Sequence, residues 1–111
     1  MVYPLQEKLH ISGMDDRAPS LARRWRLGCE DITFSYAPML DDPAALPQAA
    51  NRVAGLSRLW LHAPFAELIP CAIDPNVRAN AMARFRQTTA LAARLGVRRI
   101  VVHGGFIPYV Y

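Results

Sequence analysis

Two stretches of similar form decide the fold: LWLHAPF at residues 59–65 and IVVHGGF at residues 100–106. Each has three apolar residues, then a histidine, then a turn that contains Pro or Gly. A helix-like segment separates them, and the order strand, His, loop, helix, strand, His predicts a parallel βαβ unit. Because the carboxyl ends of parallel strands meet at one sheet edge, where parallel α/β proteins keep their functional groups, we expect His62 and His103 to be neighbours there.

The segment between the two stretches has the pattern of one long amphipathic helix. Asp74-Pro75 supplies an N-cap and a first helical residue, and Gly96 supplies the end. Apolar or small residues recur every three or four positions and predict one buried stripe. This stripe comprises Val77, Ala81, Phe85, Thr88, Ala92 and Leu95.

The residues before position 59 predict two further strand–helix units. We expect strands within 8–14, over 31–36 and over 58–63. The first helix is expected over 20–27, where Ser20 caps it and Gly28 ends it. The second helix is expected to start at Asp42-Pro43 or at Pro47 and to stop at Gly55.

The resulting β-α-β-α-β-α-β order predicts an α/β fold with a parallel sheet, about four strands and three helices. That is half of a TIM barrel, whose usual size is about 250 residues. We therefore interpret residues 1–111 as a single partial domain, the amino-terminal part of a longer protein; the alternative is a complete small open sheet. In a half barrel the open edge after the last strand favours self-association, and Leu61, Ile100 and Val102 are expected to be poorly protected.

Composition restricts the classes of protein. The chain is 52% hydrophobic, as a folded core requires, and it lacks an apolar run long enough to span a bilayer. Its start, MVYPLQEKLH, lacks the pattern of a secretory signal, so we expect a cytoplasmic protein without a membrane partner. The net charge of +4 leaves nucleic acid as a possible partner. Cys29 and Cys71 have no metal-site spacing and are expected to remain thiols.

The two histidines are the main candidates for chemistry. Imidazole is a common ligand of zinc and similar ions, and two imidazoles at adjacent strand ends can share one metal. Gly104-Gly105 permits a close backbone approach to a ligand. The loop aromatics either form an apolar wall for a sugar ring or base, or close the top of the core. These aromatics are Phe65, Phe106, Tyr109 and Tyr111.

Other polar residues near the predicted strand ends have simpler interpretations. Glu67 is a candidate for orienting a histidine, whereas Asp74 is interpreted as a helix cap. His10 is interpreted as a partly buried polar residue, and Asp41 and Asp42 as loop and cap residues. The sequence has no motif for serine nucleophiles, for phosphate-cradling loops or for CxxC metal sites.

From residue 59 to the end, the sequence resembles the xylose-isomerase-like TIM barrel superfamily, which contains sugar phosphate isomerases and epimerases and endonuclease-four-like enzymes. Residues before 59 match only loosely. The pattern is met by His62-Ala63-Pro64-Phe65, Glu67, Pro70, Asp74, Arg78, Ala92, Leu95-Gly96, Val101-Val102-His103 and Gly105.

The resemblance implies a metal-dependent enzyme that moves a proton next to a carbonyl of a sugar or sugar phosphate. It implies a divalent ion (zinc, manganese or magnesium) at His62 and His103, and a substrate pocket at Phe65, Glu67, Gly104, Gly105, Phe106 and Tyr109. In endonuclease-like members, histidines at the ends of the third and fourth strands bind zinc, which gives phosphodiester hydrolysis at abasic DNA as an alternative. Since the later strands that carry the other ligands are missing, a third possibility is an inactive or interaction half barrel.

Overall fold

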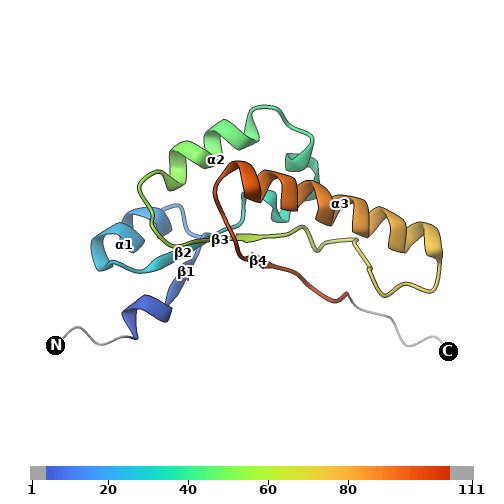
Figure 1. Cartoon of the computed structure of the whole chain (residues 1–111), viewed down its shortest axis with the longest axis horizontal. Coiled ribbons are helices and arrows are strands. Elements are labelled where there is room, and N and C mark those ends of the chain that lie inside the picture. The colour runs from blue at the N-terminus through green and yellow to red at the C-terminus, as the bar shows by residue number, and fades with distance from the viewer. Residues whose placement is uncertain (1–4, 106–111) are drawn as a thin grey trace.

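In the computed structural model, which describes residues 5–105, four parallel strands form one sheet in the order β1-β2-β3-β4 (Figure 1). The strands are β1 (His10–Ser12), β2 (Gly28–Asp31), β3 (Leu59–His62) and β4 (Ile100–Val101), and the helices are α1 (Ala18–Trp25), α2 (Ala45–Val53) and α3 (Pro75–Arg94). Short 3-10 helices cover Gln6–Lys8, Thr33–Ser35 and Ala37–Leu40. The predicted α/β class, with four parallel strands and three helices, is confirmed, and the arrangement is that of half a (βα) barrel.

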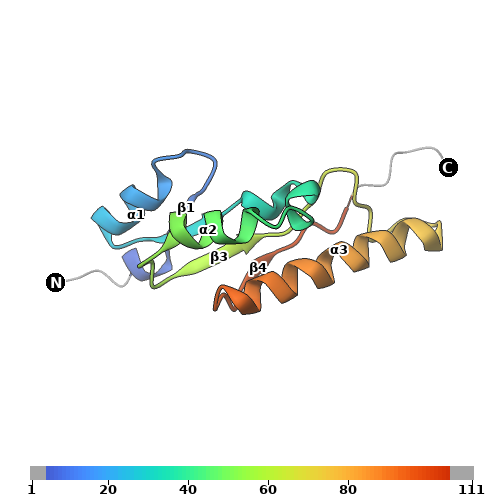
Figure 2. The same cartoon turned by 90° about the horizontal axis from the view of Figure 1, so that it is seen from above.

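The three α-helices lie on one face of the sheet and follow one another across it (Figures 1 and 2). Under α2 and α3 the core packs Phe34 and Leu61, which are almost fully buried, against alanines of both helices. A second cluster packs Cys29 under α1. Because the helices present alanines, they approach the strands closely. Leu61 was expected to be poorly protected, and this was wrong: its side chain points to the helix face and is 0% exposed.

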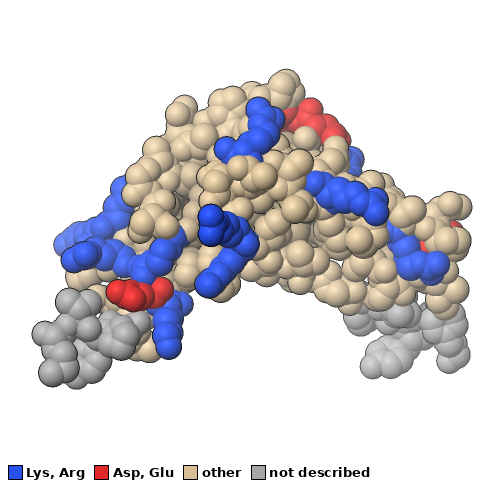
Figure 3. All heavy atoms as spheres, viewed as in Figure 1, with Lys and Arg blue, Asp and Glu red and all other residues tan. Residues whose placement is uncertain are grey.

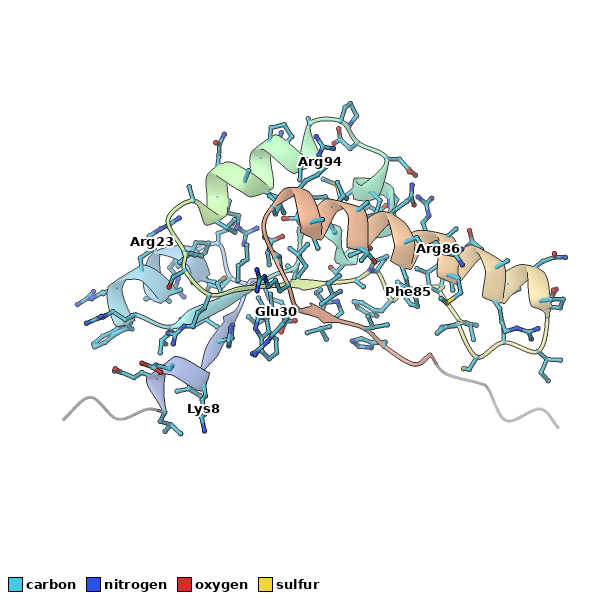
Figure 4. The ribbon with its side chains drawn as sticks, viewed as in Figure 1. Lys8, Arg23, Glu30, Phe85, Arg86 and Arg94 are labelled. Atoms are coloured by element: carbon cyan, nitrogen blue, oxygen red, sulfur yellow. The ribbon has the colours of Figure 1, made fainter. Side chains whose placement is uncertain are left out.

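The opposite face of the sheet carries polar and aromatic side chains. Register pairs Ser12 with Glu30 and Glu30 with Trp60, so these residues share one face. Figure 4 labels Glu30 on this side. Within residues 5–105, no α-helix covers it (Figure 1). A sheet with one packed face and one bare face is what half of a closed barrel presents.

The second strand and the first helix differ from their predicted positions. β2 ends at Asp31, where the prediction began, because the Asp31 carboxylate accepts hydrogen bonds from the backbone N–H and hydroxyl of Thr33 and turns the chain. The first helix begins at Ala18 rather than after Ser20, since Pro19 presets its first turn. Arg26, with φ of 56°, ends that helix instead of Gly28.

The long helix was predicted correctly at both ends but not along its whole stripe. Asp74 accepts a hydrogen bond from the Asn76 backbone, and Gly96 follows the end with φ of 70°. Ala81 and Thr88 are buried as predicted, whereas Val77 is 37% exposed. The helix has 20 residues and the strands beneath it at most four, so its first turns run past the sheet (Figure 1).

α2 begins at Ala45, between the two predicted starts, and Asp42 accepts a hydrogen bond from the Ala44 backbone as a cap residue does. β4 is shorter than expected and ends at Val101, so His103 lies beyond it.

Cys29 and Cys71 are both free thiols, the first buried and the second exposed. Burial raises the pKa of Cys29. In the part of the chain described, every helix is too short or too polar to cross a membrane.

Gly28 lets a histidine reach across a strand. His10 pairs with Gly28 in register, and its ring lies over that glycine and contacts Trp60, with 4.3 Å between ring centroids. A Cβ at Gly28 would lie 2.2 Å from the His10 ring. The missing side chain therefore permits a contact between β1 and β3 on the bare face, and it explains why His10 is only partly exposed.

Gly28→Ala is expected to displace His10 from Trp60 and to lower the free energy of unfolding by about 1–3 kcal/mol, the usual cost of overpacking. Trp60 fluorescence in a Trp25→Phe background should change at the same time. Gly104→Ala is the matched control, because a Cβ there meets no atom within 4 Å. Unchanged Trp60 emission in Gly28→Ala would show that the stack does not form.

The stability of the chain should depend on pH through His10. Burial lowers its pKa below 6.5, and Arg58 and Arg99 lower it further, against the opposing effects of a hydrogen bond with the Lys8 backbone and of Glu30. The unfolded chain therefore binds a proton first as pH falls. We expect the free energy of unfolding that neutral His10 contributes to be fully present above about pH 6.5 and to be lost as the pH falls below that value. Urea titrations between pH 5 and 8 should show a smaller loss in His10→Gln, and an equal loss would contradict this assignment.

Candidate functional site

The two predicted histidines meet at the carboxyl edge of the sheet. Nε2 of His62 lies 3.0 Å from Nε2 of His103, and their ring centroids are 4.9 Å apart. Register explains the meeting: Val101 pairs with His62, so His103, two residues further on, returns to the same face. The predicted proximity of the two imidazoles is confirmed.

A backbone carbonyl fixes the orientation of His62. Its Nδ1 lies 2.7 Å from the carbonyl oxygen of Ala63, so Nδ1 carries the proton and donates it to that oxygen. Nε2 of His62 then presents a lone pair toward His103. In the absence of a cation, Nε2 of His103 must donate a proton into this contact, because two facing lone pairs repel.

Phe65 packs against both imidazoles. Its ring stacks on His103 with centroids 4.8 Å apart and planes 20° apart, and it meets the edge of His62 at 5.2 Å. The Phe65 side chain is 47% exposed, so one side of the cluster remains open. Pro64 and Ala63, by contrast, are buried and anchor the start of the loop. The three rings therefore form a small aromatic surface, the His62–Phe65–His103 cluster.

The remaining predicted site residues are arranged as follows. Glu67 is exposed, with φ of 61°, and it is the Ala63 carbonyl rather than Glu67 that holds Nδ1 of His62. Gly105 has a φ of 91° and lies close to the loop that contains Pro70 and Cys71. A Cβ at Gly105 would lie 3.0 Å from Cδ of Pro70 and 3.2 Å from Sγ of Cys71. Gly104 faces open space. Phe106, Tyr109 and Tyr111 lie outside the described residues.

The chemistry of the cluster is that of a pair of nitrogen ligands. In tetrahedral zinc sites with Zn–N bonds of about 2.0–2.1 Å, two ligand nitrogens lie about 3.3 Å apart. The observed 3.0 Å needs only a small opening of the rings to reach that value. Within residues 5–105, no third His, Cys, Asp or Glu joins them in a group able to hold a metal.

A second feature was missed by the sequence analysis: a groove at the opposite, amino edge of the sheet. Its volume is about 940 Å³, and Arg58, Arg98 and Arg99 are among its lining residues. The signal is visible in the sequence, because Arg58 directly precedes β3 and Arg99 directly precedes β4. Equivalent positions before parallel strands meet at one edge, as equivalent positions after them do.

Comparison with known proteins gives one informative structural match. The TTHB071 protein from Thermus thermophilus, studied after soaking with ZnCl2, superposes with a TM-score of 0.68 and 27% sequence identity. The match covers 89% of this chain and 39% of that one, so the chain spans well under half of its neighbour. Since 89% of 111 residues is about 99, the neighbour has roughly 250 residues, the usual size of a complete barrel. Neither a family model nor a curated protein matches the chain.

The hydrogen bond with Ala63 predicts the tautomers of the metal-free chain. Long-range ¹H–¹⁵N spectra above pH 7 should show His62 protonated on Nδ1 and His103 protonated on Nε2. His103→Ala should leave the His62 tautomer unchanged, because the Ala63 carbonyl, and not His103, fixes it. A His62 signal with the proton on Nε2 would contradict the proposed orientation.

Proposed function

We propose that this chain is part of a divalent-metal-dependent enzyme of the sugar phosphate isomerase/epimerase type, in which His62 and His103 supply two of the metal ligands. The observation that carries the proposal is the convergence of two Nε2 atoms at 3.0 Å. The Ala63 carbonyl supports it further, since metal-binding histidines usually donate their other N–H to a carbonyl or carboxylate. Zinc, manganese and magnesium are the candidate ions.

The two imidazoles fit such an ion but do not complete its site. Imidazole is a good ligand for zinc, and structural zinc sites have four protein ligands while catalytic ones have three. The neighbour's extra length, more than half of its chain, is where a complete barrel would carry further ligands. We therefore place the missing carboxylates on a complementary half barrel, and the chain alone is expected to bind metal weakly.

In this role, each described residue has a definite task. The Ala63 carbonyl holds His62 with its Nε2 lone pair toward the site, and the stacked Phe65 ring limits the movement of His103. The half-exposed Phe65 also offers an apolar surface to one face of a sugar ring. A bound divalent ion would supply Lewis-acid polarisation of substrate oxygens next to the carbon that loses its proton.

Phosphodiester hydrolysis at abasic DNA is the second candidate. It is favoured by the location of both histidines at the carboxyl ends of the third and fourth strands: His62 is the last residue of β3, and His103 lies two residues beyond β4. These are the positions that bind zinc in the endonuclease-like enzymes that the sequence resembles. Hydrolysis needs a metal-activated water rather than a base beside a carbonyl carbon. The two candidates therefore require the same histidines and differ in substrate.

The third candidate is a half barrel that acts through association alone. β1 and β4 each have one unpaired edge within the described residues, and the polar face between them lacks a covering helix. Open strand edges favour pairing with another chain. The expected partner is a complementary half barrel or a second copy of this chain, and the mass in solution distinguishes a monomer from either assembly.

Calorimetric titration with ZnCl2 tests the metal proposal. We expect weak binding by the whole chain that His62→Ala and His103→Ala each reduce by about tenfold or more, since each removes one of two ligands. His10→Gln is the matched control because it removes the third histidine, which lies at the other edge. Equal losses in all three variants would indicate scattered surface binding and would overturn the proposal.

Zinc-loaded chain should turn over neither sugar phosphates nor abasic-site DNA, because the described residues provide no carboxylate beside the histidines. Addition of a complementary half barrel should restore one of the two activities and so identify the substrate class. Activity of the chain alone toward either substrate would contradict the need for a second half.

A further inference from the structure

Arginines gather around the groove at the amino edge of the sheet, the edge opposite to the histidine pair. The groove has a volume of about 940 Å³, within the range of small-molecule sites. Its charged lining residues are Glu7, Arg23, Arg26, Arg58, Arg98 and Arg99. Five cations against one carboxylate, among the described residues, leave a strong positive field in a concave site.

Topology explains why these arginines meet. Arg26, Arg58 and Arg99 each lie just before a strand, β2, β3 and β4 respectively, and Arg98 is adjacent to Arg99. In a parallel sheet the residues before successive strands come to the same edge. Figure 3 shows basic atoms over this part of the molecule, near α1 and the turn between α3 and β4.

Two of the arginines are fixed in the groove wall by backbone carbonyls. Arg23 donates to the carbonyls of Arg52 and Ala54, over 2.7–3.1 Å. Nη2 of Arg58 donates to the carbonyls of Gln6 and Arg26. These bonds neutralise no charge, so the guanidinium groups are held in place while their positive charge remains available.

The groove also has donors without partners. Nε of Arg58 is buried and makes no hydrogen bond. Arg98 and Arg99 are exposed, and neither takes part in the ion pairs of the described residues, which join Arg17 to Asp15 and Arg84 to Asp41. Arg99 instead lies over the Trp60 ring, 5.7 Å from its centroid. Unsatisfied donors next to unpaired cations are what an anionic ligand would complete.

We propose that this groove binds a small ligand with more than one phosphate group. Arg98 and Arg99 are the residues that contact the phosphates, and Arg58 contributes its positive charge from the wall. A guanidinium group can donate two parallel hydrogen bonds to the oxygens of one phosphate, so several arginines favour a ligand with several phosphates. The groove is bounded in volume, which favours a small ligand over a nucleic-acid strand. The site is separate from the histidine pair, so the proposal is independent of the metal function.

Calorimetry of the 111-residue chain with inorganic pyrophosphate tests this proposal. We expect saturable binding of one pyrophosphate per chain that Arg98→Gln/Arg99→Gln weakens by about tenfold or more. The matched control is Arg86→Gln/Arg94→Gln, which removes the same charge from exposed positions of α3, outside the groove (Figure 4). The control should weaken binding by less than about twofold, because neither side chain lines the groove and salt screens the field of exposed charges.

Arg98→Gln alone leaves Arg99 over Trp60, and it serves as a second variant if the double substitution unfolds. Equal weakening by the groove and control pairs, or absence of saturable binding, would overturn the proposal. A single-stranded DNA oligomer forms the last arm of the experiment. If this oligomer binds more tightly than pyrophosphate, and the Arg98→Gln/Arg99→Gln variant loses that binding, the small-ligand proposal is overturned and the groove is a nucleic-acid site. Unchanged zinc affinity in the same variants would show that the two sites are independent.

Discussion

The register between β3 and β4 is the constraint on which the histidine pair depends. Leu61 pairs with Ile100 and His62 with Val101, and backbone bonds of 3.1 and 2.9 Å, from Leu61 to Arg99 and from Ala63 to Val101, hold this register. A slip by one residue would place His103 on the helix face, among the apolar side chains. Ile100, which packs against the core cluster beside Leu61, resists such a slip because its side chain would move to the bare face.

The same parallel order gives the two edges of the sheet different chemistry. Residues that follow the strands bring imidazoles together, and residues that precede the strands bring guanidinium groups together. One face between these edges is packed under helices, whereas the other presents Glu30, Trp60 and His10 without a covering helix in the described residues. A complementary half barrel would cover that face, including His10 and Trp60 where they line the groove.

Local patterns predicted the parts of the fold that depend on local physics. Asp74-Pro75 and Gly96 define α3 because capping acts within a few residues. The second strand was misplaced since a side-chain bond, from Thr33 to Asp31, ends it before the apolar residues that resemble a strand. Val77 was assigned to the core because periodicity shows a helix face but not the length of the sheet below it.

The candidate site was predictable where it follows from topology. The meeting of His62 and His103 needed only two equivalent strand ends joined by one crossover. The hydrogen bond with Ala63 could not be predicted, because it depends on the exact turn after β3, and the arginine groove was missed because its members are far apart in sequence.

X-ray absorption at the zinc edge reports which atoms surround the ion, and it therefore shows whether His62 and His103 hold one zinc together. For the zinc-loaded chain, we expect two imidazole nitrogens at about 2.0–2.1 Å, with the other positions filled by oxygen. His10→Gln should leave this spectrum unchanged, and His103→Ala should remove one imidazole. A shell that contains sulfur from Cys71, or that keeps both imidazoles after His103→Ala, would contradict a zinc site at the histidine pair.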